Sequence, residues 1–388
     1  MIDLSALRRT FESLYGTEPR LFSAPGRVNL IGEHTDYNDG FVLPMAIDRR
    51  TVVAAAARSD RRVRVRSLNL EEDAEFDLDR PETLRRRHWL DYVEGVARIL
   101  EDGGLRLSGA ELAIESDVPV GAGLSSSAAL EVSVGLALAS VSGAEIDRVQ
   151  LAVAGQAAEH KYVGANVGIM DQFVAALASR GHALLIDCRS LEWTPIPLNL
   201  PGTAVLICDT GVKHELASSE YNTRRAECER GVRLLRQILP GIKALRDVSL
   251  AEFQKHEQHL PEPVRRRCRH VVSENARTLA FADALRSGDL EEMGRLMALS
   301  HESLRDDYEV SSRELDLLVE IATTLKEATA GARMTGGGFG GCTVNLVRRA
   351  AVEKFQEVIR REYSRVTNID PAIYMVEADD GAKTVRCP

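Results

Sequence analysis

Three prolines and a glycine fall within nine residues near the middle of the chain, at Thr194-Pro195-Ile196-Pro197-Leu198-Asn199-Leu200-Pro201-Gly202. Proline fixes its φ angle and has no backbone N–H, so this segment fits neither the inside of a helix nor a central strand. It divides the 388 residues into nearly equal halves, each of ordinary domain size. We therefore predict two domains, residues 1–199 and residues 200–388.

Strand and helix patterns occur in both halves without regular alternation. Val63 and Val65 alternate with arginines, which is typical of a strand with one buried face. Further strands are expected at 51–57, 111–116, 204–208, 343–347 and 372–376, and helices at 126–140, 147–162, 170–179, several places between 215 and 328, and 351–362. Because the two types of element do not alternate strictly, we predict an α+β fold and not a doubly wound sheet.

The charge of the chain argues against two classes of partner. The formal net charge is −9, which disfavours binding to nucleic acid or to an anionic membrane. We interpret the basic runs Arg85-Arg86-Arg87 and Arg265-Arg266-Arg267 as solvated helix faces. No apolar stretch reaches the roughly 18 residues that a membrane span needs. We expect no nucleic-acid or membrane partner, and the sequence does not reveal whether the chain has protein partners.

Cysteine usage indicates the compartment. The six cysteines are scattered and form no CxxC pair, which argues against a disulfide framework and a zinc site. The N-terminus also lacks the basic region and apolar run of a secretory signal. These features predict a reducing, cytoplasmic location.

Residues 26–40 concentrate polar side chains among turn-forming residues. Glu33, His34 and Asp36 lie within four residues, between Gly32 and Asn38. Carboxylates accept hydrogen bonds from hydroxyl groups, and histidine donates or accepts them. The segment therefore suits a loop that binds a polyhydroxylated ligand. A hydrophilic surface loop has a similar composition.

A second glycine-containing segment, Pro119-Val120-Gly121-Ala122-Gly123-Leu124-Ser125-Ser126-Ser127, leads into an apolar helix. Its glycines let the backbone approach a ligand. The first turn of the helix offers free N–H groups and the positive end of the dipole, which together favour an anion. The segment lacks the Gly-Lys-Ser/Thr ending of a Walker A loop, and no protein-kinase motif follows it. The alternative is an ordinary strand–turn–helix connection capped by serines.

A third segment, residues 334–342, holds five glycines in the six positions 336–341. Glycine loses much conformational entropy on folding, so such a run indicates close approach to a ligand or to another loop. A flexible linker is the alternative, but an apolar strand follows directly.

Two carboxylates flank the break at residues 164–168. Glu159 ends one expected helix, and Asp171 lies in the first turn of the next, where the dipole favours an ionised side chain. Magnesium prefers oxygen ligands, which Glu159 would supply. Each residue alone also fits an ordinary charge at a helix end.

Together these segments resemble the galactokinase branch of the galacto-, homoserine, mevalonate and phosphomevalonate kinases, the GHMP kinases. The resemblance extends from the N-terminal fifth to beyond residue 340. It rests on residues 26–36, 119–127, 166–172, 220–225 and 334–341. The family fold it implies is two α+β domains with the active site in the cleft between them.

The implied reaction is transfer of the γ-phosphoryl group of ATP to the anomeric hydroxyl of D-galactose, giving galactose 1-phosphate and ADP in galactose catabolism. Magnesium is the implied cofactor, and galactose and ATP are the implied ligands. By resemblance, Asp171 and Arg27 are catalytic; Glu33, His34, Thr35, Asp36, Gly168 and Tyr221 bind the sugar; Ser67, Gly121, Ala122, Gly123, Leu124, Ser125, Ser126 and Ser127 bind ATP; and Ser127 and Glu159 bind the metal.

Two alternatives remain open. The chain would phosphorylate another galactose-like sugar, such as N-acetylgalactosamine, galacturonate or arabinose, or it would be a non-catalytic sensor of galactose and ATP. Sensors that resemble galactokinases have a damaged serine–alanine stretch, and here Ser125-Ser126-Ser127-Ala128-Ala129 is complete, which favours an enzyme.

Overall fold

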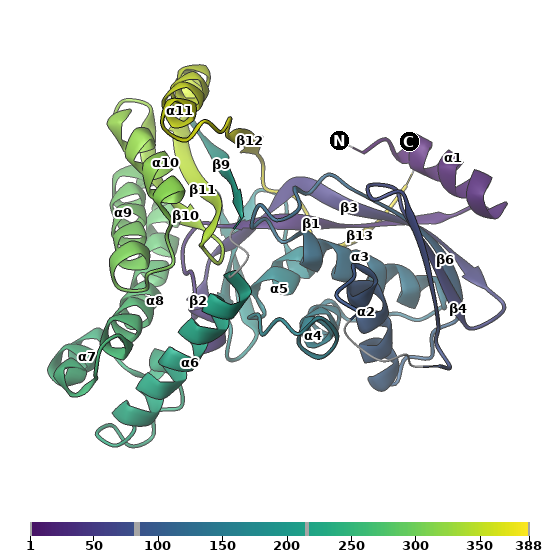
Figure 1. The fold of residues 1–388 in the computed structure, drawn as a ribbon, viewed down its shortest axis with the longest axis horizontal. Helices are drawn as coiled ribbons and strands as arrows, with labels where there is room; N and C mark the ends of the chain where they lie inside the picture. The colour runs from purple at the N-terminus through teal and green to yellow at the C-terminus, as the bar shows by residue number, and fades with distance from the viewer. Residues whose placement is uncertain (1, 81–85, 214–216, 387–388) are drawn as a thin grey trace.

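The computed structural model describes residues 2–80, 86–213 and 217–386 and forms two lobes (Figure 1). The strands are β1 (Arg20–Asn29), β2 (Phe41–Val42), β3 (Pro44–Arg58), β4 (Arg62–Ser67), β5 (Glu72–Asp77), β6 (Gly109–Ser116), β7 (His182–Asp187), β8 (Glu192–Pro197), β9 (Thr203–Lys213), β10 (Thr329–Thr335), β11 (Gly340–Arg348), β12 (Ala372–Val376) and β13 (Lys383–Val385). The α-helices are α1 (Leu4–Tyr15), α2 (Leu90–Asp102), α3 (Ser126–Val141), α4 (Arg148–Ala158), α5 (Met170–Leu177), α6 (Ala217–Leu235), α7 (Leu250–His256), α8 (Val264–Ser287), α9 (Leu290–Asp306), α10 (Arg313–Thr324) and α11 (Val352–Thr367). Short helical turns are η1 (Asp36–Asn38), η2 (Glu159–Val163), η3 (Leu245–Asp247), η4 (Glu257–His259) and η5 (Arg349–Ala351).

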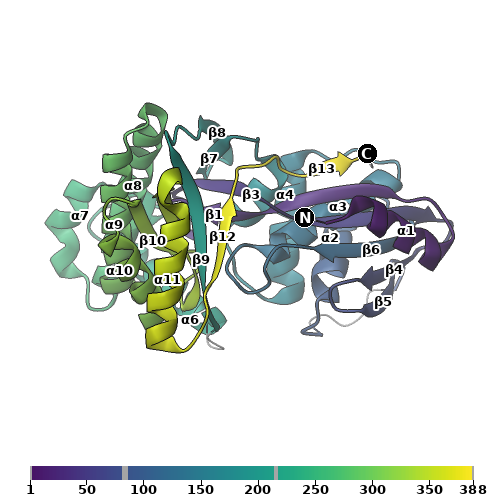
Figure 2. The same ribbon diagram turned by 90° about the horizontal axis from the view of Figure 1, so that it is seen from above.

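The first lobe is built on a six-stranded sheet in the order β13-β1-β3-β6-β4-β5. Along β3, side chains alternate between the two faces, as the period of a strand requires. Val52 and Ala54 pack with Phe11 of α1, whereas Val53 and Ala55 belong to the core formed with α2, α3, α4 and α5. Both faces of this sheet are therefore covered, and β1 and β3 form a fixed platform that extends to the other lobe (Figure 2).

The second lobe is built on a four-stranded antiparallel sheet in the order β10-β11-β9-β12. Its Leu206 face packs on α10 and α11 through side chains such as Phe355. On the opposite face, Ile207 belongs to a core that includes Phe281 of α8 and Val28 of β1. One apolar cluster thus contains residues of both lobes and joins them. The prediction of a two-domain α+β fold is confirmed.

The proline-rich segment avoids helices and central strands, as predicted. Pro195 and Pro197 lie in β8, an edge strand of the three-stranded sheet β2-β7-β8. An edge strand tolerates proline because its outer N–H groups need no partner strand. The end of the chain returns to the first lobe, where Val385 of β13 pairs with Leu21 of β1 (Figure 2). The boundary between residues 199 and 200 stays a prediction.

Part of the first motif, which is residues 26–40 and was interpreted above as a loop, is a strand. Residues up to Asn29 belong to β1, and the loop begins after them. The register with β3 shifts between Pro25 and Arg27, which marks a bulge. Here the N–H of Arg27 donates to the carbonyl of Leu124 at 3.0 Å. Turn-forming residues suggested a loop, but a bulge accommodates Pro25 and Gly26 within a sheet.

Two smaller interpretations also change. The segment expected to be one helix at 147–162 is divided into α4 and the π-helical turn η2. Such turns are often found at functional sites. In the basic run at 265–267, Arg267 is buried and donates to the carboxylates of Glu227 and Glu309 at 2.8 and 2.5 Å. Of the other run, Arg86 and Arg87 precede α2, and Arg85 lies outside the described residues.

No helix within the described residues is both long and apolar enough to cross a membrane. The five described cysteines, Cys188, Cys208, Cys228, Cys268 and Cys342, are free thiols.

Close packing of α9 on β10 fixes the strand that leads into the third glycine-rich segment. A Cβ on Gly294 would lie 1.8 Å from the carbonyl oxygen of Ala330. We expect Gly294→Ala to lower the free energy of unfolding by about 1–3 kcal/mol, because the helix must move off the strand. Urea or thermal unfolding measures this. Gly103→Ala is the matched control, since its nearest contacts would be at 3.4 Å; equal effects of both variants would contradict the prediction.

Candidate active site

A cavity of about 190 Å³ between the lobes brings together segments from both halves of the chain. The end of β1, the first-motif loop, the break before α5, the start of α6 and the turn between β10 and β11 all contribute to its wall. The lining residues are Arg27, Glu33, His34, Asp36, Val167, Gly168, Met170, Asp171, Tyr221, Gly336 and Gly337.

The two predicted catalytic residues form a pair in this cavity. Arg27 of β1 donates from Nε and Nη2 to the two carboxylate oxygens of Asp171, both at 2.7 Å. Asp171 lies in the first turn of α5, as predicted, and its side chain is 23% exposed against 6% for Arg27. Such a bidentate pair fixes the plane of the carboxylate. Arg27 thus fixes the carboxylate of Asp171, while part of the Asp171 side chain still faces the cavity.

Ser125 links this pair to the second motif, which is the glycine-containing segment of residues 119–127. It precedes α3 in the left-handed conformation, with φ of 59°, and its side chain does not cap the helix. Its hydroxyl instead donates a short hydrogen bond to Oδ2 of Asp171. The guanidinium of Arg27 also donates to the carbonyl of Gly123 at 2.6 Å. The reading of this segment as an ordinary serine-capped turn is therefore wrong.

Asp36 and Gly168 meet on the sugar-binding side predicted from the sequence. A Cβ on residue 168 would lie 1.7 Å from Oδ2 of Asp36, so a larger residue there would displace the side chain of Asp36. Burial, with the nearby Asp171 carboxylate as the next cause, raises the pKa of Asp36 to about 7. Burial likewise holds the pKa of Tyr221, which lines the same cavity, well above its ordinary value.

His34 lies in an aromatic cluster beside these groups. Its ring centroid is 5.5 Å from that of Tyr221 and 4.8 Å from that of Tyr308. Its Nδ1 is 2.8 Å from the hydroxyl of Tyr37. Burial lowers the pKa of His34 to about 3, so the imidazole is neutral at neutral pH and offers one donor and one acceptor.

Glu33 lines the cavity and also joins the first and third motifs. Its Oε1 accepts from the N–H of Gly336 at 2.7 Å, and its Oε2 accepts from Nδ2 of Asn29 at 2.7 Å. Thr35, in contrast, is not among the lining residues. Its hydroxyl is within hydrogen-bonding distance of the carbonyls of Gly32 and Phe41, at 2.9 and 2.6 Å, so it holds the loop itself.

A second cavity, of about 430 Å³, lies at the start of α3. Ser67, Ser126 and Ser127 line it together with the aromatic side chains of Trp89 and Tyr92. Residues Gly121, Ala122, Gly123, Leu124 and Ser125 span the stretch between Val120 and Ser126, which both line this cavity. Because Ser125 reaches Asp171, this stretch connects the two cavities.

The third motif packs against the second, as its glycines suggested. A Cβ on Gly336 would lie 3.3 Å from the carbonyl oxygen of Gly123. Gly338 has φ of +80°, and a Cβ there would lie 2.1 Å from the carbonyl oxygen of Val310. The run of glycines is therefore a site of close backbone approach, not a linker.

The two predicted metal ligands also lie together. The side chain of Ser127 is close enough to Glu159 to lower its pKa, and the amide of Gln172 donates to Oε2 of Glu159 at 2.6 Å. The same amide donates to Oε2 of Glu131 at 2.9 Å. Burial, followed by the charge of Asp171, raises the pKa of Glu159 to about 7. The pKa of Glu131 is raised well above its usual range by burial and by Glu159.

This region fits a magnesium ion. Its donors are all oxygens, and its carboxylates outnumber the nearby arginine, so a hard cation would relieve their repulsion. Oε1 of Glu131 is buried without a hydrogen-bond partner. No group of three or more His, Cys, Asp or Glu side chains gathers as a metal site in the described parts of the chain.

Glu131 was not predicted as a site residue, although the sequence carried a signal for it. It is a charged residue inside the otherwise apolar helix α3, and it is fully buried. A buried charge of this kind usually has a specific partner. Its partner, Gln172, is 41 positions away in sequence, which the pattern along α3 does not reveal.

Comparison with known proteins identifies the family. The model described as "Galactokinase galactose-binding signature" matches residues 9–57, and the N- and C-terminal GHMP kinase domain models match 91–179 and 281–365. A galactokinase of Roseiflexus sp. is 50% identical over 386 residues, covering 99% of this chain and 98% of the relative. A galactokinase of Chloroflexus aurantiacus is 54% identical over 92% of this chain and 91% of the relative. This chain belongs to the galactokinase family.

Solved structures agree with this membership. The Lactococcus lactis galactokinase complexed with galactose is 37% identical and matches with a TM-score of 0.95, over 98% of this chain and 100% of that chain. The Methanococcus jannaschii mevalonate kinase, at 17% identity, matches with a TM-score of 0.67 over 94% and 100% of the two chains, which shows the shared fold. Like other galactokinases, the chain is an ATP-dependent sugar kinase with the two-domain GHMP fold.

The raised pKa of Asp36 predicts a pH dependence of sugar binding. The sequence predicts that sugar hydroxyls donate to Asp36. Such hydrogen bonds favour the ionised form, so we expect binding of galactose to release the proton that Asp36 carries below its pKa. Ionisation near pH 7 then makes the Kd of galactose fall about tenfold between pH 6 and pH 8. Calorimetry without ATP or magnesium measures this, because it leaves Glu159 unengaged. We expect Asp36→Asn to remove the dependence, and an unchanged slope in that variant would assign it to another group.

Proposed function

We propose that this chain transfers the γ-phosphoryl group of ATP to the anomeric hydroxyl of D-galactose, giving galactose 1-phosphate and ADP, as the entry of galactose into catabolism. The observation that carries the proposal is the fixed Asp171 carboxylate at the junction of a small polar cavity and a loop that opens a helix. Membership of the galactokinase family supports the choice of sugar.

The first cavity suits a single sugar ring. Its volume of about 190 Å³ is below the roughly 300 Å³ at which pockets for drug-sized ligands begin. Glu33, His34, Asp36 and Tyr221 supply side-chain acceptors and donors for hydroxyl groups, and Gly168 supplies backbone. Thr35 serves the sugar through the shape of the loop. The galactose in the complex of the Lactococcus lactis relative supports this assignment.

The second cavity suits the nucleotide. Trp89 and Tyr92 provide flat apolar surface for a base, beside Ser67. The phosphates then lie along residues 121–127, where the N-terminus of α3 provides free N–H groups and a positive dipole end. Phosphoryl transfer depends chiefly on positioning and on stabilising spread negative charge, which this arrangement supplies.

Asp171 receives the proton of the sugar hydroxyl during transfer. The sugar oxygen forms a bond to the γ-phosphorus, the bond from that phosphorus to the β–γ bridging oxygen breaks, and ADP leaves with the electron pair. Arg27 faces the same carboxylate and stabilises negative charge at the reacting oxygens. Because Arg27 and Ser125 already occupy both carboxylate oxygens, we favour a role in which Asp171 orients the hydroxyl and accepts its proton late.

Ser127 and Glu159 are the residues that would hold magnesium. When bound, the ion neutralises phosphate charge and orients the γ-phosphoryl group. Gln172, which also donates to Glu131, holds Glu159 in place.

We also propose the division of labour between the halves of the chain. Residues 1–199 carry most of the sugar and ATP groups, and residues 200–388 close the sugar cavity with Tyr221 and Gly336. We place the reaction in the cytoplasm, where the free thiols stay reduced.

A panel of sugars tests the proposed function. A site whose buried polar groups pair with galactose leaves one of them unpaired when glucose, which differs at carbon 4, is bound. We expect kcat/KM for glucose to be lower by about three orders of magnitude, and N-acetylgalactosamine to fail because of its bulk at carbon 2. Equal use of either sugar would overturn the galactose assignment. Binding of galactose and ATP without ADP formation would instead make the chain a sensor.

Removing the charge of Asp171 tests its catalytic role. We expect Asp171→Asn to lower kcat by at least the roughly 10²–10⁴ that acid–base assistance contributes, with galactose and ATP still bound. Steady-state kinetics, calorimetric Kd values and the Tm are measured together, since Arg27 loses its counter-charge in this variant. A kcat within tenfold of the parent would rule out an essential role for this carboxylate.

A further inference from the structure

Helix α8 of the second lobe contacts the back of the sugar loop, defined here as residues 32–36. Oε1 of Glu274 accepts from the backbone N–H of Gly32 at 3.0 Å. Nε2 of His270 lies 3.1 Å from the carbonyl oxygen of Glu33. These two side chains lie one helical turn apart on α8, and both are fully buried. Neither side chain lines the sugar cavity.

The backbone that they hold is strained. Gly32 has φ of +96° and His34 has φ of +63°. A Cβ on Gly32 would lie 2.8 Å from the carbonyl oxygen of Phe41. Histidine rarely adopts the left-handed conformation, and such a conformation persists only where the surroundings enforce it. The hydrogen bonds from α8 are enforcing contacts of this kind.

Glu274 is a charged acceptor, and both of its carboxylate oxygens accept hydrogen bonds from other side chains. Its Oε1 also accepts from Oγ of Ser300 at 2.6 Å, and its Oε2 accepts from Nε of Arg277 at 2.6 Å. Burial alone raises the pKa of Glu274, but Arg277, His270 and Arg333 outweigh it and hold the pKa at about 2. A carboxylate that stays ionised makes a stronger hydrogen bond to the Gly32 N–H than a neutral acceptor does.

The partners of His270 define its tautomer. A carbonyl oxygen only accepts, so Nε2 of His270 carries the proton and donates to Glu33. Nδ1 then accepts from the hydroxyl of Ser303, at 2.9 Å. Burial lowers the pKa of His270 to about 4, which keeps the ring neutral and this arrangement intact at neutral pH.

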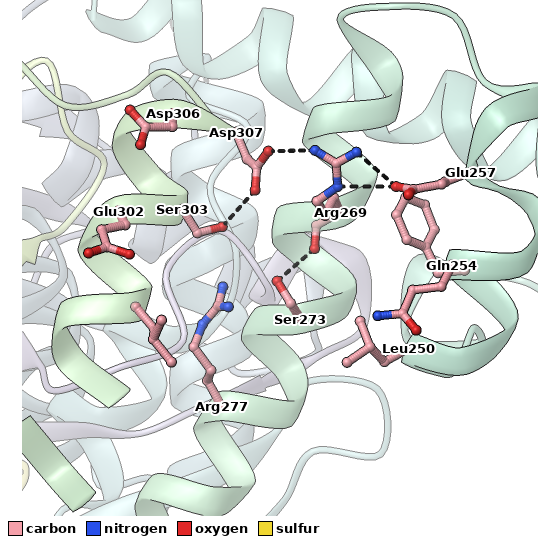
Figure 3. Close-up of a pocket in the computed structure, with 12 residues that line it drawn as sticks. Leu250, Gln254, Glu257, Arg269, Ser273, Arg277, Glu302, Ser303, Asp306 and Asp307 are labelled. Carbon is pink, nitrogen blue, oxygen red and sulfur yellow. Dashed lines mark hydrogen bonds and ion pairs between the residues drawn. The ribbon is translucent and has the colours of Figure 1, made fainter. Parts of the chain in front are cut away.

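The outer partners of these two groups line a separate cavity of about 420 Å³ among α7, α8 and α9 (Figure 3). Arg277 and Ser303 lie on its wall, with Arg269 joined to Asp307 and Glu257 by ion pairs (Figure 3). The supporting side chains of α8 therefore extend from this outer surface to the sugar loop. They are held by partners that take no part in binding the sugar.

We propose that Glu274 and His270 are positioning residues for sugar recognition. They fix the backbone of Gly32 and Glu33 so that Glu33, His34 and Asp36 present their side chains to the cavity. The inference rests on the proposed role of this loop in binding galactose. Loss of either residue weakens galactose binding and leaves the nucleotide site, on the other side of Asp171, largely unaffected.

Paired substitutions at residue 274 test the proposal. We expect Glu274→Ala to raise the Kd and KM of galactose at least tenfold while the KM of ATP stays within twofold. Glu274→Gln keeps an oxygen that accepts from Gly32, so it should restore the Kd of galactose to within threefold of the parent. Glu302→Ala is the matched control, because Glu302 is exposed, lines the same outer cavity and makes no hydrogen bond to the loop in the described structure.

Variants of His270 test the proposal separately, whether or not the Glu274 variants fold. His270→Leu should raise the Kd of galactose about tenfold, and His270→Gln, which keeps a donor near the Nε2 position, should stay within threefold of the parent. The proposal is overturned if the Kd of galactose is unchanged in both Glu274→Ala and His270→Leu. It is also overturned if these variants lose affinity for galactose and for ATP equally. Failure of the proposed function is distinct, because the parent itself would then bind no galactose, or Asp36→Ala would bind it as the parent does.

Discussion

The side chain of Arg27 holds together the parts from which the site is made. Its guanidinium pairs with Asp171 at the start of α5 and donates to Gly123 in the loop before α3, while its backbone N–H bonds Leu124 in that loop. A planar group with five donors in fixed directions specifies the relative placement of strand, loop and helix at once. A lysine at this position would keep the charge and lose that geometry.

Charge is the second constraint on the site. Asp36, Asp171, Glu159 and Glu131 are carboxylic groups of one region, and the pKa values of Asp36, Glu159 and Glu131 are all raised, with burial as the largest cause. ATP would bring further negative charge to it. Such a site is stable in its empty form because some carboxyl groups keep their protons, and it depends on a cation when the phosphates are present. On the roles proposed for these groups, binding of metal–nucleotide and of sugar is linked to proton release.

Much of the fold, and most of the residues that line the first cavity, could be predicted from the sequence. The period-2 run around Val63 and the apolar helix after Ser125 are local patterns, and local patterns survive in the structure. The family motifs predicted a shared site for Arg27, Asp36, Gly168, Asp171 and Tyr221. The structure brings them to one cavity, although nearly 200 residues separate the first from the last.

What the sequence did not reveal depends on contacts between distant segments. The bulge at Arg27 is visible only when β3 and the loop of Leu124 are beside it. The roles of Glu131 and Glu274 follow from partners on other helices or in the other lobe, and no pattern along one helix indicates them. Thr35 resembles a sugar ligand by its place in the motif, but its hydroxyl is used inside the loop.

The pairing of β13 with β1 has a consequence for the order in which the protein is made. β1 leaves the ribosome well before β13, the strand that covers its edge, because the second lobe lies between them in the sequence. Domains fold as they emerge, N-terminal parts first, and an unpaired strand edge invites pairing with other chains. During synthesis the first lobe therefore carries an open edge for almost the whole time that the second lobe is being translated, and this is the interval in which a nascent chain most needs protection from its neighbours.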